Sequence, residues 1–110
     1  MIQLNNVSKY YPAGFGKTYV LRNIDLGISS GEFVSIMGPS GSGKSTLLHI
    51  LGLLEEPSEG EYLLMDEQVH KLSDKKRTQL HRNAIGFVFQ AYHLIDELTV
   101  YENIETPLLY

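Results

Sequence analysis

The 110-residue sequence contains no cysteine. This absence excludes a disulfide framework and any thiolate-based zinc or iron–sulfur site in these residues. It agrees with a reducing compartment but does not require one. No run of about 18 apolar residues occurs, so we expect no membrane-spanning helix. Residues 1–5 lack the basic and apolar regions of a secretory signal. The remaining composition, 43% hydrophobic and 20% charged, is typical of a single globular domain.

Positive charge is absent from the last quarter of the chain. Residues 1–82 hold nine acidic and nine basic groups, whereas four acidic residues and no basic residue follow Arg82, giving a net charge of −4. This balance argues against a general nucleic-acid binder. The four histidines lack the mutual spacing of metal ligands. Four glutamates, Glu55, Glu56, Glu59 and Glu61, are expected to form a solvated turn.

The most informative stretch fits G-x-x-x-x-G-K-[ST], the phosphate-binding P-loop. It consists of Gly38, Pro39, Ser40, Gly41, Ser42, Gly43, Lys44, Ser45 and Thr46. An apolar run at 33–37 precedes it and good helix formers at 46–51 follow it. We therefore expect a buried strand to lead the glycines to a helix N-terminus. The alternative is a Gly/Ser-rich turn that binds nothing. A chance match to the motif is much rarer, however, once Lys and then Ser or Thr are also required.

The chemistry of this arrangement suits a nucleotide phosphate. Glycines tolerate positive φ and let the backbone approach a ligand closely. Successive N–H groups and the positive end of the helix dipole then attract an anion. Lys44 is expected to reach the β- and γ-phosphates, and the Ser45 hydroxyl to ligate Mg²⁺.

The rest of the pattern predicts an α/β fold. Alternating residues predict strands at 2–7 and 19–28 with a loop at 10–17, which favours an antiparallel sheet before the P-loop. We also expect a strand at 61–65, with 67–69 continuing its pattern, and a polar surface helix at 74–83 capped by Ser73. A buried parallel strand is expected at 85–89, followed by a loop at 90–97. A last helix is opened by a Thr99–Glu102 capping box and ended or kinked by Pro107. The fold class is a partial P-loop NTPase core with an N-terminal antiparallel β subdomain.

Over residues 1–110 the chain resembles the N-terminal half of an ABC-transporter ATP-binding subunit. The features that carry the resemblance are the P-loop, Tyr11 just after the first strand, the segments 21–26 and 31–37, and Gln90 closing an apolar strand. The tail at 89–108 is similar to the branch of macrolide exporters, lipoprotein-release ATPases and peptide-antibiotic resistance pumps.

The resemblance implies particular roles for residues of this chain. Tyr11 stacks on the adenine ring of ATP, although the neighbouring Tyr10 could be confused with it. Gly38–Thr46 wrap the phosphates, and Lys44 offsets charge on the γ-phosphate during transfer to water. Ser45 and Gln90 complete the Mg²⁺ shell. Lys44 and Gln90 are thus the catalytic residues present; without the resemblance, Gln90 reads as a polar residue that ends a strand.

The resemblance also implies partners and a location. The segment after Gln90 touches a membrane permease subunit, with an apolar contact from Tyr92, Leu94, Ile95 and Leu98, unless these side chains cover the domain's own core instead. A second ATP-binding subunit completes a dimer. The expected function is to couple ATP binding and hydrolysis to transport, at the cytoplasmic face of the cell membrane as a peripheral subunit.

The departure from the family pattern is large. The chain stops at Tyr110, and we identify no Leu-Ser-Gly-Gly-Gln signature, no Walker B motif after the expected strand at 85–89 and no later switch histidine. We therefore expect weak MgATP binding without efficient hydrolysis from these residues alone. Two other classes stay open, namely a guanylate-kinase-like nucleotide kinase, which has a similar Gly-Pro-Ser-Gly loop, and a non-catalytic nucleotide-binding interaction module.

Overall fold

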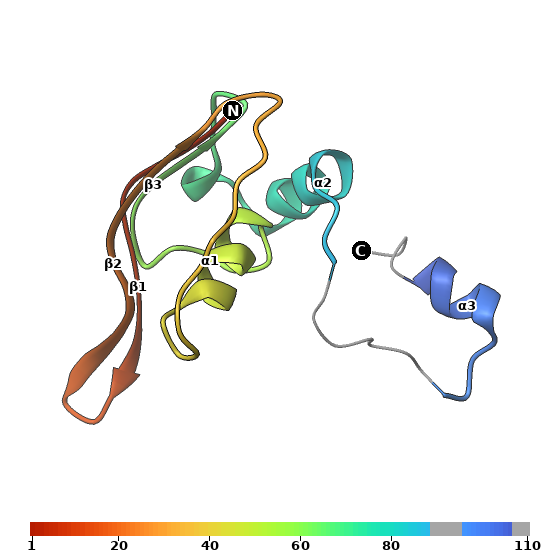
Figure 1. Cartoon of the computed structure of the whole chain (residues 1–110), viewed down its shortest axis with the longest axis horizontal. Helices are drawn as coiled ribbons and strands as arrows, with labels where there is room; N and C mark the ends of the chain where they lie inside the picture. The colour runs from red at the N-terminus through yellow and green to blue at the C-terminus, as the bar shows by residue number, and fades with distance from the viewer. Residues whose placement is uncertain (89–95, 107–110) are drawn as a thin grey trace.

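The computed structural model describes residues 1–88 and 96–106. Its centre is a four-stranded antiparallel sheet in the order β2-β1-β3-β4 (Figure 1). The strands are β1 Ile2–Ala13, β2 Gly16–Ile28, β3 Glu59–Leu64 and β4 Glu67–Gln68. The expected antiparallel β subdomain is confirmed.

The predicted loop at 10–17 is wrong, because β1 and β2 continue through it as one long hairpin. Their pairing runs to Ala13 and Gly16 with only a two-residue turn between them. Tyr10 and Tyr19 face each other across the two strands with ring centroids 5.4 Å apart. Cross-strand aromatic pairs stabilise such ladders, and here that contact outweighs the loop signal of Pro12 and the two glycines. The tip of the hairpin extends beyond the rest of the molecule (Figure 1).

Within residues 1–88 and 96–106, four helical segments accompany the sheet. They are α1 Lys44–Leu51, the 3₁₀ turn η1 Val69–Lys71, α2 Asp74–Ala84 and α3 Val100–Glu105. Both predicted caps are confirmed, since the Ser73 hydroxyl accepts from the Lys76 N–H and Thr99 forms a capping box with Glu102. Among the described residues, no helix is long and apolar enough to cross a membrane.

The core lies between the sheet and α1. Its buried hydrophobic side chains, among the residues that the structure describes, are Leu4, Val7, Leu21, Leu47, Ile50, Leu51, Leu53, Tyr62, Leu64 and Val69. Helix α2 buries no residue, as the polar pattern predicted. Its His81 Nδ1 donates a hydrogen bond of 2.6 Å to the carbonyl of Gly52, which attaches α2 to the end of α1. Helix α1, which follows the P-loop, is therefore held by its packing against the sheet and by the hydrogen bond from α2.

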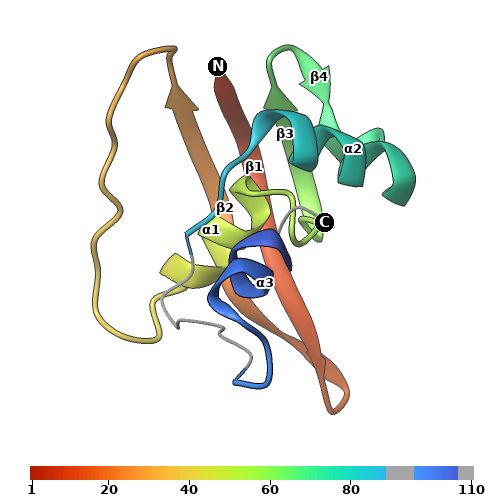
Figure 2. The same ribbon diagram turned by 90° about the vertical axis from the view of Figure 1, so that its right-hand side faces the viewer.

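The predicted strands at 33–37 and 85–89 are not observed as strands in the described part of the chain. Phe33, Met37 and Val88 expose 98%, 89% and 95% of their surface. Ile36 alone of the first run packs against the core. A strand is held by hydrogen bonds to a neighbouring strand, and no described strand lies beside either run. Residues 29–43 instead form a long open excursion outside β2 (Figure 2).

Candidate functional site

The P-loop turns from its open approach into α1 through glycines in left-handed conformations. Gly41 has φ 82° and Gly43, the residue that precedes the helix, has φ 95°. A Cβ on Gly43 would lie 2.8 Å from the Val20 carbonyl oxygen and 2.9 Å from Leu21 Cδ2. Only glycine satisfies both the backbone angle and this close approach to β2. The sheet therefore fixes the position of the loop.

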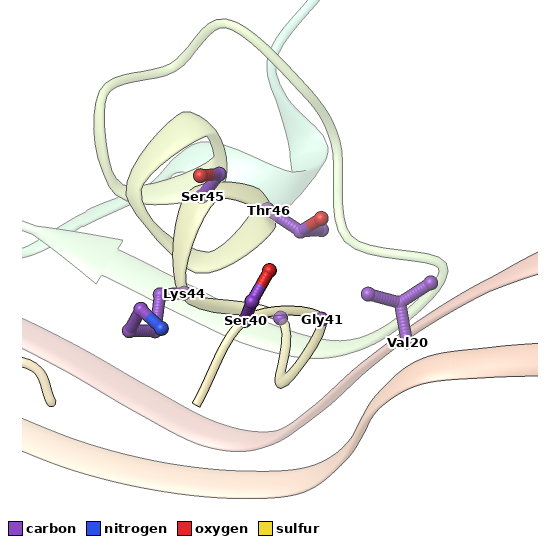
Figure 3. A pocket seen from close by; sticks show the side chains of 7 residues that line it. Val20, Ser40, Gly41, Lys44, Ser45 and Thr46 are labelled. Carbon is purple, nitrogen blue, oxygen red and sulfur yellow. The ribbon is translucent and has the colours of Figure 1, made fainter. Parts of the chain in front are cut away.

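A pocket of about 450 Å³ opens at this helix start (Figure 3). Its size falls within the usual range for small-molecule sites. Val20 of β2 lies along one side of the pocket. The other lining residues all belong to the predicted P-loop: Ser40, Gly41, Gly43, Lys44, Ser45 and Thr46. The structure thus brings six of the nine predicted loop residues around one cavity.

The pocket attracts negative charge. The first N–H groups of a helix have no intrahelical acceptor, and here no side chain caps them and no acidic residue lies in the first turn. The Lys44 ammonium donates hydrogen bonds to the carbonyl oxygens of Gly38 and of Pro39, the latter at 2.8 Å. Both the cation and the positive helix end therefore lie beside the pocket, an arrangement that suits phosphate oxygens.

The same pocket could admit a magnesium ion together with phosphates. In the described residues no group of three or more His, Cys, Asp or Glu could hold a metal by itself. Mg²⁺ seldom needs such a cage, since it keeps several waters and binds through one or two protein groups plus substrate phosphates. The Ser45 hydroxyl lines the pocket and supplies a suitable oxygen. The residues present fit this mode of binding.

Tyr11 lies on β1 opposite Thr18 of β2, close in register to Val20. Its hydroxyl donates to Glu55 Oε1 at 2.5 Å, and this carboxylate raises the pKa of the Tyr11 phenol. The side chain of Tyr11 is 41% exposed. It is not among the residues that line the pocket, so its stacking role stays a prediction. The Tyr10 ring instead packs against Tyr19.

Two contributors to this region carry no clear signal in the sequence. Val20 reaches the pocket because β2 passes the P-loop, which depends on tertiary packing. Glu55 was expected in a solvated turn, but its carboxylate binds Tyr11 and lies 3.4 Å from Lys9 Nζ. The composition of the turn predicts an exposed carboxylate but does not indicate that Tyr11 and Lys9 are its partners. The expectation of a fully solvated turn is therefore wrong for Glu55.

The other predicted site residues fall mainly outside the described residues. Gln90, with its metal-binding and catalytic roles, lies there, as do Tyr92, Leu94 and Ile95 of the expected permease contact. Leu98 is described and is partly buried. Pro107, the expected end of the last helix, also lies outside the described part.

A glycine-rich loop that leads into a helix, with Lys and Ser beside a pocket of small-molecule size, defines a P-loop nucleotide-binding protein. The family comparison makes this class specific. A family model described as ABC transporter matches residues 21–108. The chain belongs to the ABC transporter family of ATP-binding proteins. This membership leaves the nucleotide-kinase alternative without support.

Individual relatives agree with this assignment. The chain is 51% identical to the uncharacterized ABC transporter ATP-binding protein MJ0796 of Methanocaldococcus jannaschii, over 100% of this chain and 47% of that protein. It is also 51% identical to the macrolide export ATP-binding/permease protein MacB of Wolinella succinogenes, over 100% of this chain and 17% of that protein. The chain thus spans about half the length of the relatives that consist of the ATP-binding protein alone.

A solved structure confirms the fold. The dimeric post-hydrolysis state of the ATP-binding cassette MJ0796, bound to ADP and Pi, matches with a TM-score of 0.91 at 50% identity. The match covers 99% of this chain and 47% of that one. The predicted fold class, a P-loop NTPase cassette with an N-terminal antiparallel sheet, is confirmed.

Proposed function

We propose that the whole protein containing these residues is the ATP-binding subunit of an ABC transporter, and that it couples ATP binding and hydrolysis to transport. The observation that carries this proposal is the pocket at the N-terminus of α1, lined by the P-loop of a chain that belongs to this family. Helix N–H groups, Lys44 and hydroxyl groups converge there, which is the donor set that a nucleoside triphosphate requires.

Each residue has a defined task in this proposal. The backbone of Gly38–Thr46 wraps the β- and γ-phosphates, while the Lys44 ammonium exchanges its loop carbonyl acceptors for phosphate oxygens. Ser45 offers its hydroxyl to Mg²⁺, and Gln90 is the second proposed protein ligand. Bound Mg²⁺ supplies charge neutralisation at the phosphate oxygens. Tyr11 offers its exposed ring to the adenine base.

The proposed partners are permease subunits of the membrane and a second ATP-binding subunit. The fusion of ATP-binding and permease parts in the MacB relative supports the first partner. The dimeric structures of the MJ0796 cassette support the second. With such partners the protein works at the cytoplasmic face of the cell membrane. The macrolide-export and pyoverdine-export names among the relatives favour an exporter.

The test is to measure MgATP binding to the Lys44→Ala variant by titration calorimetry. We expect affinity to fall by about a hundredfold, because charge-assisted hydrogen bonds contribute about 1.5–3 kcal/mol each. Lys75→Ala, which removes a cation from the exposed surface of α2, is the matched control and should bind as the unaltered chain does. Undiminished binding by Lys44→Ala would contradict the proposed site.

A further inference from the structure

Three side chains form a cluster between the hairpin and the segment that follows α1. Glu55 Oε1 accepts the Tyr11 hydroxyl at 2.5 Å and lies 3.4 Å from Lys9 Nζ. Lys9 Nζ also lies 5.3 Å from the centroid of the Tyr11 ring and donates to the Glu56 carbonyl at 2.8 Å. The edge of the Tyr11 ring is thus held by the Glu55 carboxylate, while an ammonium group lies over the ring.

Glu55 is itself attached to the helix that forms the phosphate pocket. Its backbone N–H donates to the His49 carbonyl at 3.2 Å, beside a parallel bond of 2.9 Å from the Leu54 N–H to the same oxygen. His49 belongs to α1, whose other end carries Lys44. One helix therefore connects the P-loop at its start with the Tyr11 hydroxyl beyond its end.

We propose that Glu55 is a positioning residue for nucleotide binding: it sets the Tyr11 ring at a fixed place relative to the phosphate pocket through α1. The inference rests on the proposed function, in which Tyr11 contacts the base. A ring held before the ligand arrives loses less conformational freedom on binding, so affinity for a ligand with a base rises. A ligand that has phosphates but no base gains nothing from Glu55.

The exposure of these groups fits a positioning role. Tyr11 is 41% exposed, so part of its ring surface remains available to a base. The Glu55 side chain is 28% exposed and the Lys9 side chain 14%, so both groups that hold the ring are largely sheltered from solvent. Lys9, in turn, orients the carboxylate through their ion pair.

The neighbouring Glu56 provides a matched control. Its carboxylate pairs with Arg77 of α2 and its side chain makes no contact with Tyr11 among the interactions of the described residues. Glu56→Ala removes the same charge one residue away. The backbone carbonyl that Lys9 binds is unchanged by this substitution.

The experiment compares MgATP with magnesium tripolyphosphate, which has phosphates and no base, by titration calorimetry of the full chain. Glu55→Ala is expected to weaken MgATP binding about three- to tenfold, the contribution of one hydrogen bond, and to leave tripolyphosphate binding unchanged. Glu55→Gln keeps an oxygen that accepts the Tyr11 hydroxyl and should restore most of the MgATP affinity. Glu56→Ala should match the unaltered chain with both ligands.

Two further measurements separate the possible failures. Removal of Glu55 should lower the pKa of the Tyr11 phenol toward its ordinary value, which phenolate absorbance reports when the Tyr11→Phe curve is subtracted. If Tyr11→Ala weakens MgATP binding but Glu55→Ala does not, the positioning role is overturned while the proposed function stands. If Tyr11→Ala changes neither ligand, the base contact itself is wrong and the inference falls with it. Equal weakening of both ligands by Glu55→Ala would mean general disruption and would also overturn it.

Discussion

At the scale of single residues, Tyr62 joins the sheet to the helix of the pocket. It is fully buried on β3, and its hydroxyl donates a hydrogen bond of 2.6 Å to the Leu51 carbonyl at the end of α1. Burial raises the pKa of the Tyr62 phenol to about 12. The folded chain therefore holds this proton more tightly than the unfolded chain does, which ties stability to alkaline pH.

The stability of the chain should consequently fall between pH 10 and pH 12. Below pH 10 Tyr62 is protonated in both states and its contribution is constant. Above pH 10 the unfolded state loses the proton first, so the free energy of unfolding falls by about 1.4 kcal/mol per pH unit and by about 2.7 kcal/mol across the window. Urea unfolding at successive pH values measures this slope.

Tyr62→Phe is the control for this pH dependence. At neutral pH it should cost about 1–3 kcal/mol, because the Leu51 carbonyl loses its partner in the core. Between pH 10 and pH 12 its stability should fall less steeply than that of the unaltered chain, since the remaining tyrosines are common to both proteins. Equal slopes would show that another group carries the alkaline transition.

The loop that lines the pocket was predictable residue by residue, whereas the surroundings of the pocket were not. A P-loop is nine consecutive residues whose backbone and side chains all act locally, so its sequence specifies its geometry. Val20 and Glu55 reach the same region only through the path of β2 and the turn after α1. No local pattern encodes such contacts. The described residues leave the predicted role of Gln90 as a prediction.

At the scale of elements, a feature was predicted correctly where the residue that stabilises it lies close by in the sequence. The helix caps at Ser73 and Thr99 depend on residues three positions ahead, and the sequence predicted both. The hairpin was predicted too short, because the ring contact of Tyr10 with Tyr19 becomes apparent only in register. The apolar run at 33–37 has strand propensity, but propensity without a neighbouring strand yields extended, exposed chain.

Hydrogen exchange tests this view of residues 33–37. Within the described residues their N–H groups donate no hydrogen bond, so we expect these amides to exchange close to the unprotected rate. Amides of β1 that pair with both β2 and β3, around Leu4, should exchange at least about a hundredfold more slowly. Mass spectrometry of peptic fragments resolves the two segments. Equal protection of 33–37 and β1 would contradict the absence of a strand there.

At the scale of the whole molecule, we expect the 110-residue chain to bind MgATP without hydrolysing it. In the resembled family, a carboxylate at the end of an apolar strand activates the attacking water. Asp66 and Glu67 follow the apolar strand β3 here, but neither lines the P-loop pocket, and no carboxylate is among the described residues that line it. We expect the 110-residue chain to bind MgATP and to release phosphate no faster than its Lys44→Ala variant. A phosphate-release assay at saturating MgATP measures this. Turnover abolished by Lys44→Ala would show that these residues suffice for hydrolysis.

The long hairpin has a practical consequence. Its turn places Phe15 in full exposure beyond the sheet, on the hairpin that also carries Tyr11, and these 110 residues contain no cysteine. Phe15→Cys would therefore introduce one chemically addressable position. A fluorophore attached there would stand at the tip of the hairpin that carries the proposed base contact, four residues from Tyr11 in the sequence, and would leave the P-loop unaltered. A change in its emission on addition of MgATP would report nucleotide arrival in real time.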